Sequence, residues 1–179
     1  TTPTETMQAM VTKDQFEDTR ESQYLVTEPY VYQGKMIVEQ TYPIAIDGQF
    51  VGIAGVDFAL ADVQANLRRL CARECLDLFL VSSRGRFIAA TTEPEIEAED
   101  RAEDALITRE VAASEYADLF EDLLKTRSSD RPILAVDPLD GDKYYFTSSR
   151  METGGWTLIA RESEGQILAP IWGQIFFRL

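Results

Sequence analysis

The chain has 179 residues, of which 17 are basic, 31 are acidic and none is histidine. Its formal net charge of −14 repels phosphate backbones, so we expect no nucleic-acid partner. The chain also lacks the usual general base and the commonest metal ligand, and we expect no metal, no cofactor and no catalytic residue.

Residues 1–22 are polar and charged, which favours a loop or a short helix. The next two runs, residues 30–46 and 49–58, are rich in β-branched and aromatic side chains, which are typical of strands. Asp47-Gly48 separates the two runs. An Asp-Gly pair in this position predicts a β-hairpin with a tight turn.

Apolar residues recur at helical spacing from Leu60 to Leu70, which predicts a helix that ends near the two cysteines, Cys71 and Cys75. The cysteines leave two alternatives open. They form a local disulfide in an oxidising compartment, or they remain free thiols because a bridge between positions i and i+4 of one helix is strained.

The second half of the chain predicts a hairpin over residues 76–91 with a turn at residues 83–85. The acidic stretch 93–104 is typical of a solvated loop or helix face. Apolar residues on one face of residues 112–126 predict a helix. Three further strands are expected at residues 132–136, 143–149 and 156–161.

The two halves follow one plan, of which the first half shows only the later part. We therefore expect an α+β fold with two antiparallel-sheet modules, the first incomplete and the second with one or two flanking helices. The expected boundaries are residues 1–72, 73–165 and 166–179. The apolar segment 167–179 is either a helix docked on the core or an exit helix that leads toward a membrane segment.

Several runs resemble the modules of double-Cache sensors, which are PAS-like domains. In the first half these are residues 27–32, 41–44 and 50–57, and the pattern Gly-x-x-Gly-x-Asp that ends at Asp57 is the most specific. The second half resembles a second module from residue 78 onward. The resemblance covers about residues 24 to 170.

This resemblance implies an extracytoplasmic sensor, periplasmic or extracellular, that is anchored through flanking membrane segments absent from this chain. Such a domain is not itself an enzyme. It binds an amino acid, an amine or a small carboxylate, is sometimes a homodimer, and signals to a cytoplasmic output such as a histidine kinase or a chemotaxis domain. One departure is that Tyr32 stands where amino-acid-binding members have Asp. Another is that the Arg-x-Trp-Tyr element of those members is missing.

A two-residue turn at Asp47-Gly48 fixes the register of the predicted hairpin. Because side chains alternate between faces, cross-strand partners point to the same side. The predicted partners are Tyr42 with Ile53, Gln40 with Gly55, and Val38 with Asp57.

On this face Gly55 leaves a hollow between polar neighbours, and Asp57 is an acid in an apolar strand. Asp57 either binds a ligand ammonium through a charge-assisted hydrogen bond or caps the helix that follows. Tyr30 and Tyr32, which share one face of their strand, either form a pocket wall or pack as core or rim aromatics. The candidate ligand-binding residues are Asp57, Tyr30, Tyr32, Gln40, Tyr42 and Gly55.

Two other function classes remain open, a structural or adhesive ectodomain and a carboxylate-based hydrolase. The hydrolase is disfavoured because the acidic residues of 93–104 lie in a polar stretch, with no apolar environment to raise a carboxyl pKa. A ligand sensor is the interpretation that the sequence favours.

Overall fold

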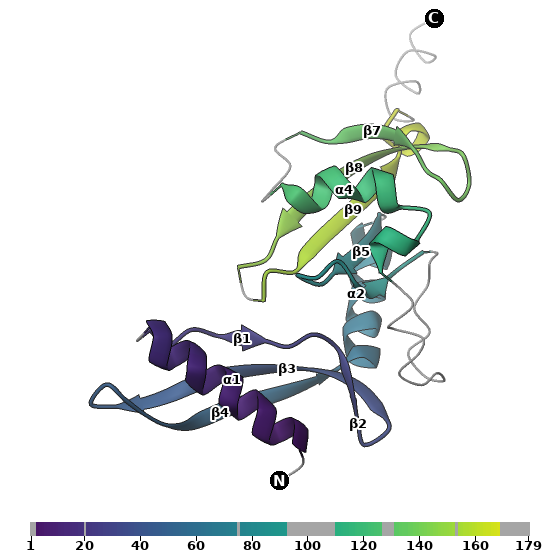
Figure 1. The fold of residues 1–179 in the computed structure, drawn as a ribbon. Helices are drawn as coiled ribbons and strands as arrows, with labels where there is room; N and C mark the ends of the chain where they lie inside the picture. Colours follow the sequence, from purple (N-terminus) through teal and green to yellow (C-terminus); the bar gives the residue numbers. More distant parts are fainter. Residues whose placement is uncertain are drawn as a thin grey trace, which may run out of the picture. The chain divides into compact units, whose positions relative to one another are not determined.

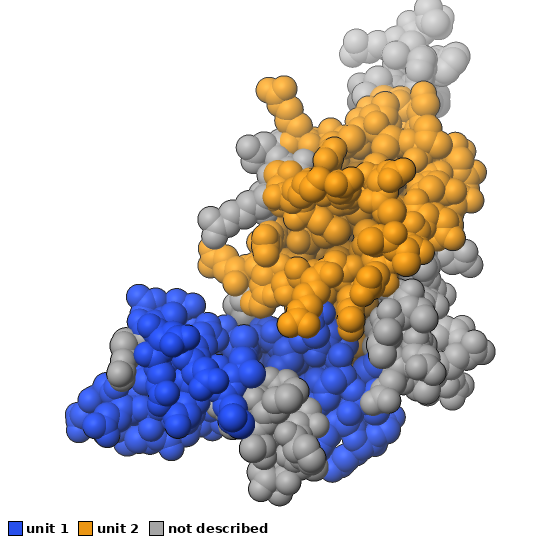
Figure 2. All heavy atoms as spheres, in the orientation of Figure 1, with its two compact units in different colours: residues 1–59 blue, residues 60–179 orange. Residues whose placement is uncertain are grey.

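The computed structural model describes residues 3–19, 21–74, 76–92, 110–126, 131–152 and 154–168. The chain forms two compact units, residues 1–59 and 60–179, which Figure 2 colours separately. The helix that begins at Leu60 groups with the second unit. The predicted domain boundary at residues 72/73 remains a proposal.

In the first unit a helix lies across an antiparallel sheet (Figure 1). The sheet is built on a long hairpin of β3 (Lys35–Ile46) and β4 (Gln49–Ala59). Two short strands, β1 (Leu25–Val26) and β2 (Tyr30–Tyr32), also pair with β3. The helix is α1 (Pro3–Thr19), a 17-residue helix where the sequence predicts only a loop or a short helix.

The predicted hairpin turn at Asp47-Gly48 is confirmed. Asp47 has a φ of 51° and Gly48 a φ of 73°, so both central residues adopt left-handed conformations. Two positive φ values define a turn whose twist matches that of the flanking strands, and Asp-Gly is one of the few pairs that tolerate it.

The second unit begins with α2 (Leu60–Glu74), which confirms the helix predicted after the hairpin. A five-stranded antiparallel sheet follows, with the order β6-β5-β9-β8-β7. Residues 164–168 are helical after the last strand. The strands confirm those predicted, and their bounds are β5 (Asp77–Val81), β6 (Phe87–Ala90), β7 (Ile133–Val136), β8 (Lys143–Arg150) and β9 (Thr157–Ser163).

The helix predicted over residues 112–126 is divided into two pieces. A short 3-10 helix, η1 (Val111–Ala113), is followed by α4 (Ala117–Lys125). Ser114 separates them because its hydroxyl donates to the Val111 carbonyl at 2.7 Å and accepts from the Tyr116 amide at 3.2 Å. Such local bonds compete with those of a continuous helix.

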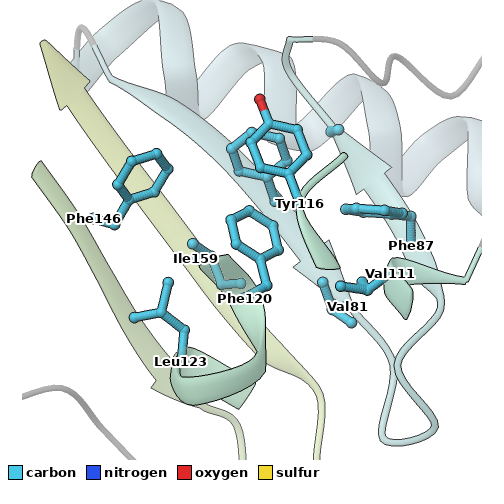
Figure 3. Packing of buried hydrophobic residues seen from close by; sticks show 10 residues of the cluster. Val81, Phe87, Val111, Tyr116, Phe120, Leu123, Phe146 and Ile159 are labelled. Carbon is cyan, nitrogen blue, oxygen red and sulfur yellow. The ribbon is translucent and has the colours of Figure 1, made fainter. Parts of the chain in front are cut away.

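The core of the second unit lies between its sheet and α4. Phe120 of α4 stacks on Tyr116, with ring centroids 4.7 Å apart (Figure 3). It also packs edge-on against Phe79 of β5, with centroids 5.2 Å apart. These contacts bury the apolar face that the sequence predicts for this helix. The full cluster is Phe79, Val81, Phe87, Ala90, Val111, Tyr116, Phe120, Leu123, Phe146 and Ile159.

Some predictions fall on residues outside the described ranges, namely the acidic stretch 93–104, Cys75 and most of the segment 167–179. Cys71 is half-buried on α2 as a free thiol. None of the described helices is both long and apolar enough to cross a membrane.

Candidate functional site

A β-bulge in the hairpin changes the predicted register. The strands start in register at Ile46 and Gln49, but the pairing shifts between Ile44 and Ala45, which leaves Val51 as an extra residue in β4. One extra residue moves every later pair by one position. The observed partners are Glu39 with Asp57, Thr41 with Gly55, and Tyr42 with Ala54.

The predicted set of site residues is therefore divided between the two faces of the sheet. Four of the six candidates, Tyr30, Tyr32, Gly55 and Asp57, lie on one face, because their cross-strand partners are alternate residues of β3 from Lys35 to Thr41. We call this the acidic face, since it also carries Glu39 and Thr41.

The prediction that Gln40 and Tyr42 share a face with Gly55 and Asp57 is wrong. Both lie on the opposite face, where the Tyr42 ring packs against Tyr24 with centroids 4.7 Å apart. The physical reason is the bulge, because a shift of one residue exchanges the two faces of a strand.

Helix α1 covers part of the acidic face. Thr12 of α1 and Thr41 of β3 are both buried, and their hydroxyl oxygens form a hydrogen bond at 2.8 Å. One turn farther along, the buried ring of Phe16 packs against Phe50, with centroids 6.2 Å apart. Helix α1 thus covers the acidic face at Thr41. Glu39 and Asp57 form the next cross-strand pair on the same face.

Tyr30 and Glu39 are joined by a hydrogen bond on the acidic face. The Tyr30 hydroxyl donates to Glu39 Oε2 at 3.2 Å. Burial, and then the negative charges of Glu39 and Asp57, raise the pKa of Tyr30 well above its ordinary value of 10.0. Tyr30 is therefore a neutral hydrogen-bond donor, and it orients one of the two facing carboxylates.

The backbone of Glu39 is also fixed. Its amide donates to the Thr27 hydroxyl at 2.9 Å, and its carbonyl accepts from the Thr27 amide, also at 2.9 Å. Thr27 is itself buried. Glu39 is thus positioned through both its main chain and its side chain, as a preorganised binding group requires.

Gly55 makes room for the Glu39 carboxylate. A Cβ atom at position 55 would lie 2.9 Å from Glu39 Oε1, closer than real Cβ contacts come. The side chain at position 39 therefore occupies the hollow that the sequence predicts at Gly55. The sequence gives no signal that Glu39 belongs to the site, since only the bulge brings it opposite Asp57.

Asp57 lies within β4 and is exposed to solvent. Helix α2 begins at Leu60, so the capping position is Ala59 and Asp57 lies two residues before it. The alternative role as a helix cap is therefore not supported by the geometry. What remains on the acidic face is a pair of carboxylates on adjacent strands, an arrangement that attracts a cationic group.

The second unit contains a buried ionic cluster that the sequence does not predict as a site. Arg161 of β9 donates through Nη1 to Asp137 and through Nε to Asp77 Oδ2 at 3.0 Å. The Tyr116 hydroxyl donates to Asp137 Oδ2 at 2.9 Å. Because Asp137 and Arg161 are 0% and 5% exposed, their charges are satisfied by each other rather than by water.

Two hollows lie in the second unit. One of about 300 Å³ is lined by Tyr145, Ala160 and Ile167, among others. The other, of about 230 Å³, is lined by residues that include Cys71 and Gln166. Neither contains a predicted site residue. Among the residues that the structure describes, no group of three or more acidic or cysteine side chains is placed to hold a metal ion.

The sequence matches no family model, and it matches no curated protein. The structure, in contrast, is similar to solved sensor domains. The extracellular domain of mmHK1S-Z3, which is described as a histidine kinase, is 21% identical with a TM-score of 0.62, over 89% of this chain and 55% of that one.

Two chemoreceptor domains are similar as well. The sensory domain of the Campylobacter jejuni chemoreceptor Tlp3 is 16% identical with a TM-score of 0.54, over 85% of this chain and 52% of that one. The ligand-binding domain of the Pseudomonas fluorescens chemoreceptor CtaA, solved with L-leucine, is 18% identical with a TM-score of 0.50, over 83% of this chain and 56% of that one.

The chain thus spans little more than half the length of each of these three domains. It has the α+β fold of extracellular sensor domains, with two antiparallel sheets and a few helices, which confirms the predicted fold class. These neighbours are of the class that the resemblance to Cache sensors implies.

Proposed function

We propose that this chain is the ligand-sensing part of an extracytoplasmic receptor. The observation that carries the proposal is the similarity of most of the chain to sensor domains of histidine kinases and chemoreceptors. In this proposal the domain lies in the periplasm or outside the cell, performs no catalysis, and passes ligand occupancy to a cytoplasmic output through membrane segments. Pairing with a second copy of the receptor belongs to the same proposal.

The acidic face is the proposed ligand site. Glu39 and Asp57 lie opposite each other, and Tyr30 holds the Glu39 carboxylate while it keeps its own proton. Two facing carboxylates stabilise an ammonium group and repel an anion. Of the ligand classes expected from the sequence, an amine or an amino acid therefore fits better than a small carboxylate.

The first unit is proposed to be the later part of a membrane-distal module. In the part of the chain that the structure describes, β4 pairs only with β3, although its counterpart β9 is flanked by both β8 and β5. β4 is long, and Val51, Val56 and Phe58 are 55%, 58% and 44% exposed. Long apolar edge strands are usually covered, which supports a further strand beside β4.

A thermal-shift screen tests the proposed function. Amines, amino acids and small carboxylates are each added to the 179-residue chain, and the melting temperature is measured. A compound at 100 times its Kd adds about 2.7 kcal/mol to the free energy of unfolding, which is a readily measured shift. We expect a hit among the amines or amino acids.

Two variants identify the site of any hit. Asp57→Asn should abolish the shift, because it removes the carboxylate that faces Glu39. Asp62→Asn is the matched control, since Asp62 is an exposed acid in the first turn of α2, outside the acidic face. A screen without hits would contradict the sensor function, and a shift that survives in Asp57→Asn would contradict the site.

A further inference from the structure

We propose that a hydrogen-bonded relay through the second unit connects α2 to β9, and that it carries the state of the ligand site to the C-terminal helical segment. The relay is Gln64, residues 90–92 and Arg161. This inference rests on the proposed function for its biological meaning. The connection itself is a property of the second unit.

The relay begins at the helix that follows the proposed site. β4, which carries Asp57, ends at Ala59, and α2 begins at the next residue. No loop intervenes to absorb a displacement of the strand. In this proposal a displacement of the end of β4 on ligand binding passes to α2 through the continuous chain.

Gln64 fastens α2 to the edge of the second sheet. The side chain is 4% exposed, and its amide donates to the Ala90 carbonyl while its Oε1 accepts from the Ala90 amide at 3.0 Å. One side chain thus satisfies both backbone groups of one residue of β6. Because all these groups are buried, a sliding movement of α2 would leave them unpaired, which is costly.

The two residues after Ala90 continue the connection. Two hydrogen bonds join Thr91 to Leu78 of β5. The Thr91 amide donates to the Leu78 carbonyl at 2.9 Å, and the Leu78 amide donates to the Thr91 hydroxyl at 2.8 Å. The hydroxyl of Thr92 accepts from Arg161 Nη2 at 3.1 Å. Three consecutive residues therefore contact α2, β5 and β9 in turn.

Arg161 of β9 is the last residue of the relay. Its guanidinium is held by Asp77 and Asp137 and lies 4.3 Å from the centre of the Tyr144 ring. A guanidinium is planar, so it responds to a displacement at one hydrogen bond by reorienting the others. Arg161 lies only three residues before the helical segment 164–168.

The two ends of the relay, Gln64 and Arg161, are buried, and hydrogen-bonded buried groups have discrete arrangements rather than a continuum, as a transmitting element requires. Coupling through the relay is tested by perturbing one end and observing the other. Coupling is also reciprocal, and both directions can be measured.

The experiment is NMR hydrogen exchange on the whole 179-residue chain without ligand. Gln64→Leu breaks the first contact, and the readout is exchange of the Arg161 Nε–H, which donates to Asp77. Thr92→Val breaks the last contact with little change of shape, and the readout is exchange of the Ala90 amide. Gln64→Leu should accelerate exchange of the Arg161 Nε–H, and Thr92→Val exchange of the Ala90 amide, each by about fivefold or more. Fivefold is the lower end of the coupling between two sites that is typical of allosteric proteins.

Thr126→Val is the matched control, because it removes a threonine hydroxyl that bonds only within the end of α4. It should leave both exchange rates unchanged.

If Gln64→Leu does not fold, the measurement on Thr92→Val decides the question by itself. Unchanged exchange of the Ala90 amide in Thr92→Val would overturn the relay, whether or not the screen finds a ligand. A screen without hits alongside coupled exchange would reject the sensor function and leave the relay standing.

Discussion

Glu39 and Asp57 are cross-strand partners on one face because of a single additional residue in β4. The Tyr30 hydroxyl and the backbone contacts with Thr27 hold Glu39 in place on this face. Two carboxylates on adjacent strands are both stabilised when a cation enters between them. At the residue scale, this is the feature that gives the acidic face its proposed specificity.

Gly55→Ala is expected to impair the site without unfolding the first unit. The new methyl group would lie 2.9 Å from Glu39 Oε1, so the end of Glu39 must shift, and we expect this to break the hydrogen bond between Tyr30 and Glu39 Oε2. Loss of one such contact lowers the affinity for the screen hit by about tenfold. Isothermal titration calorimetry measures this change.

Gly52→Ala is the matched control in the same strand, because no atom lies within 4 Å of a Cβ atom there. It should bind the hit with unchanged affinity. If Gly55→Ala and Gly52→Ala bind the hit equally well, Glu39 does not contribute to the site.

Tyr116 makes the stability of the second unit decrease as the pH rises into the alkaline range. Burial above all, together with the hydrogen bond to Asp137, raises the pKa of Tyr116 above its ordinary value of 10.0, although Arg161 acts in the opposite direction. Above pH 10 the unfolded chain loses this proton while the native chain keeps it, so stability falls as pH rises. Below that pH the contribution is fully present.

Tyr116→Phe should therefore flatten the alkaline loss of stability. The variant is less stable at neutral pH because it loses a hydrogen bond to the buried Asp137. Its free energy of unfolding should nevertheless decline less between about pH 9 and 11 than that of the original chain. Urea titrations across this range measure both slopes, and parallel slopes would refute the argument.

At the element scale, α1 depends on tertiary contacts for its position. The helix is polar, and the apolar contact that the structure describes beneath it is that of Phe16 with Phe50. Helical stability in proteins comes mainly from packing of one face, so the position of α1 should depend strongly on this contact, beside the Thr12–Thr41 hydrogen bond.

Phe16→Ala is expected to release α1 from the sheet. Phe16 is 3% exposed, and removing a buried phenyl ring costs about 3–5 kcal/mol. Hydrogen exchange of the α1 amides should accelerate, while β3 and β4 remain protected at their centres. Val11→Ala, at a position on the same helix that is 46% exposed, is the control and should change little. Equal protection in both variants would show that the helix is held by other contacts.

At the scale of the whole molecule, the two units differ in the size of their sheets and in where the main core lies. All ten residues of the main hydrophobic cluster lie between Phe79 and Ile159, within the second unit. The sheet of the second unit has five strands and a covering helix, whereas β4 of the first unit pairs only with β3 in the part of the chain that the structure describes.

Residues 60–179 should therefore fold without the first unit. An isolated fragment with these bounds should give a dispersed amide NMR spectrum and a cooperative unfolding transition, because its core needs no residue from 1–59. A collapsed spectrum would show that the first unit is required for the second to fold.

The sequence by itself determined the parts of the fold that depend on local information. The Asp47-Gly48 hairpin, the strands of the second sheet and the helix after Phe58 all follow from turn chemistry and from the spacing of apolar residues. The α+β class follows from their order along the chain. Four of the six candidate site residues also share a face in the structure.

Only the tertiary structure decided the rest, because those features depend on contacts between distant residues. The bulge at Val51 set which residues face Asp57, excluded Gln40 and Tyr42 from that face and added Glu39. The docking of α1 and the buried partners of Gln64 and Arg161 carry no periodic signal, since each depends on contacts between residues far apart in the sequence. Spacing along the chain specifies elements, whereas packing specifies which side chains meet.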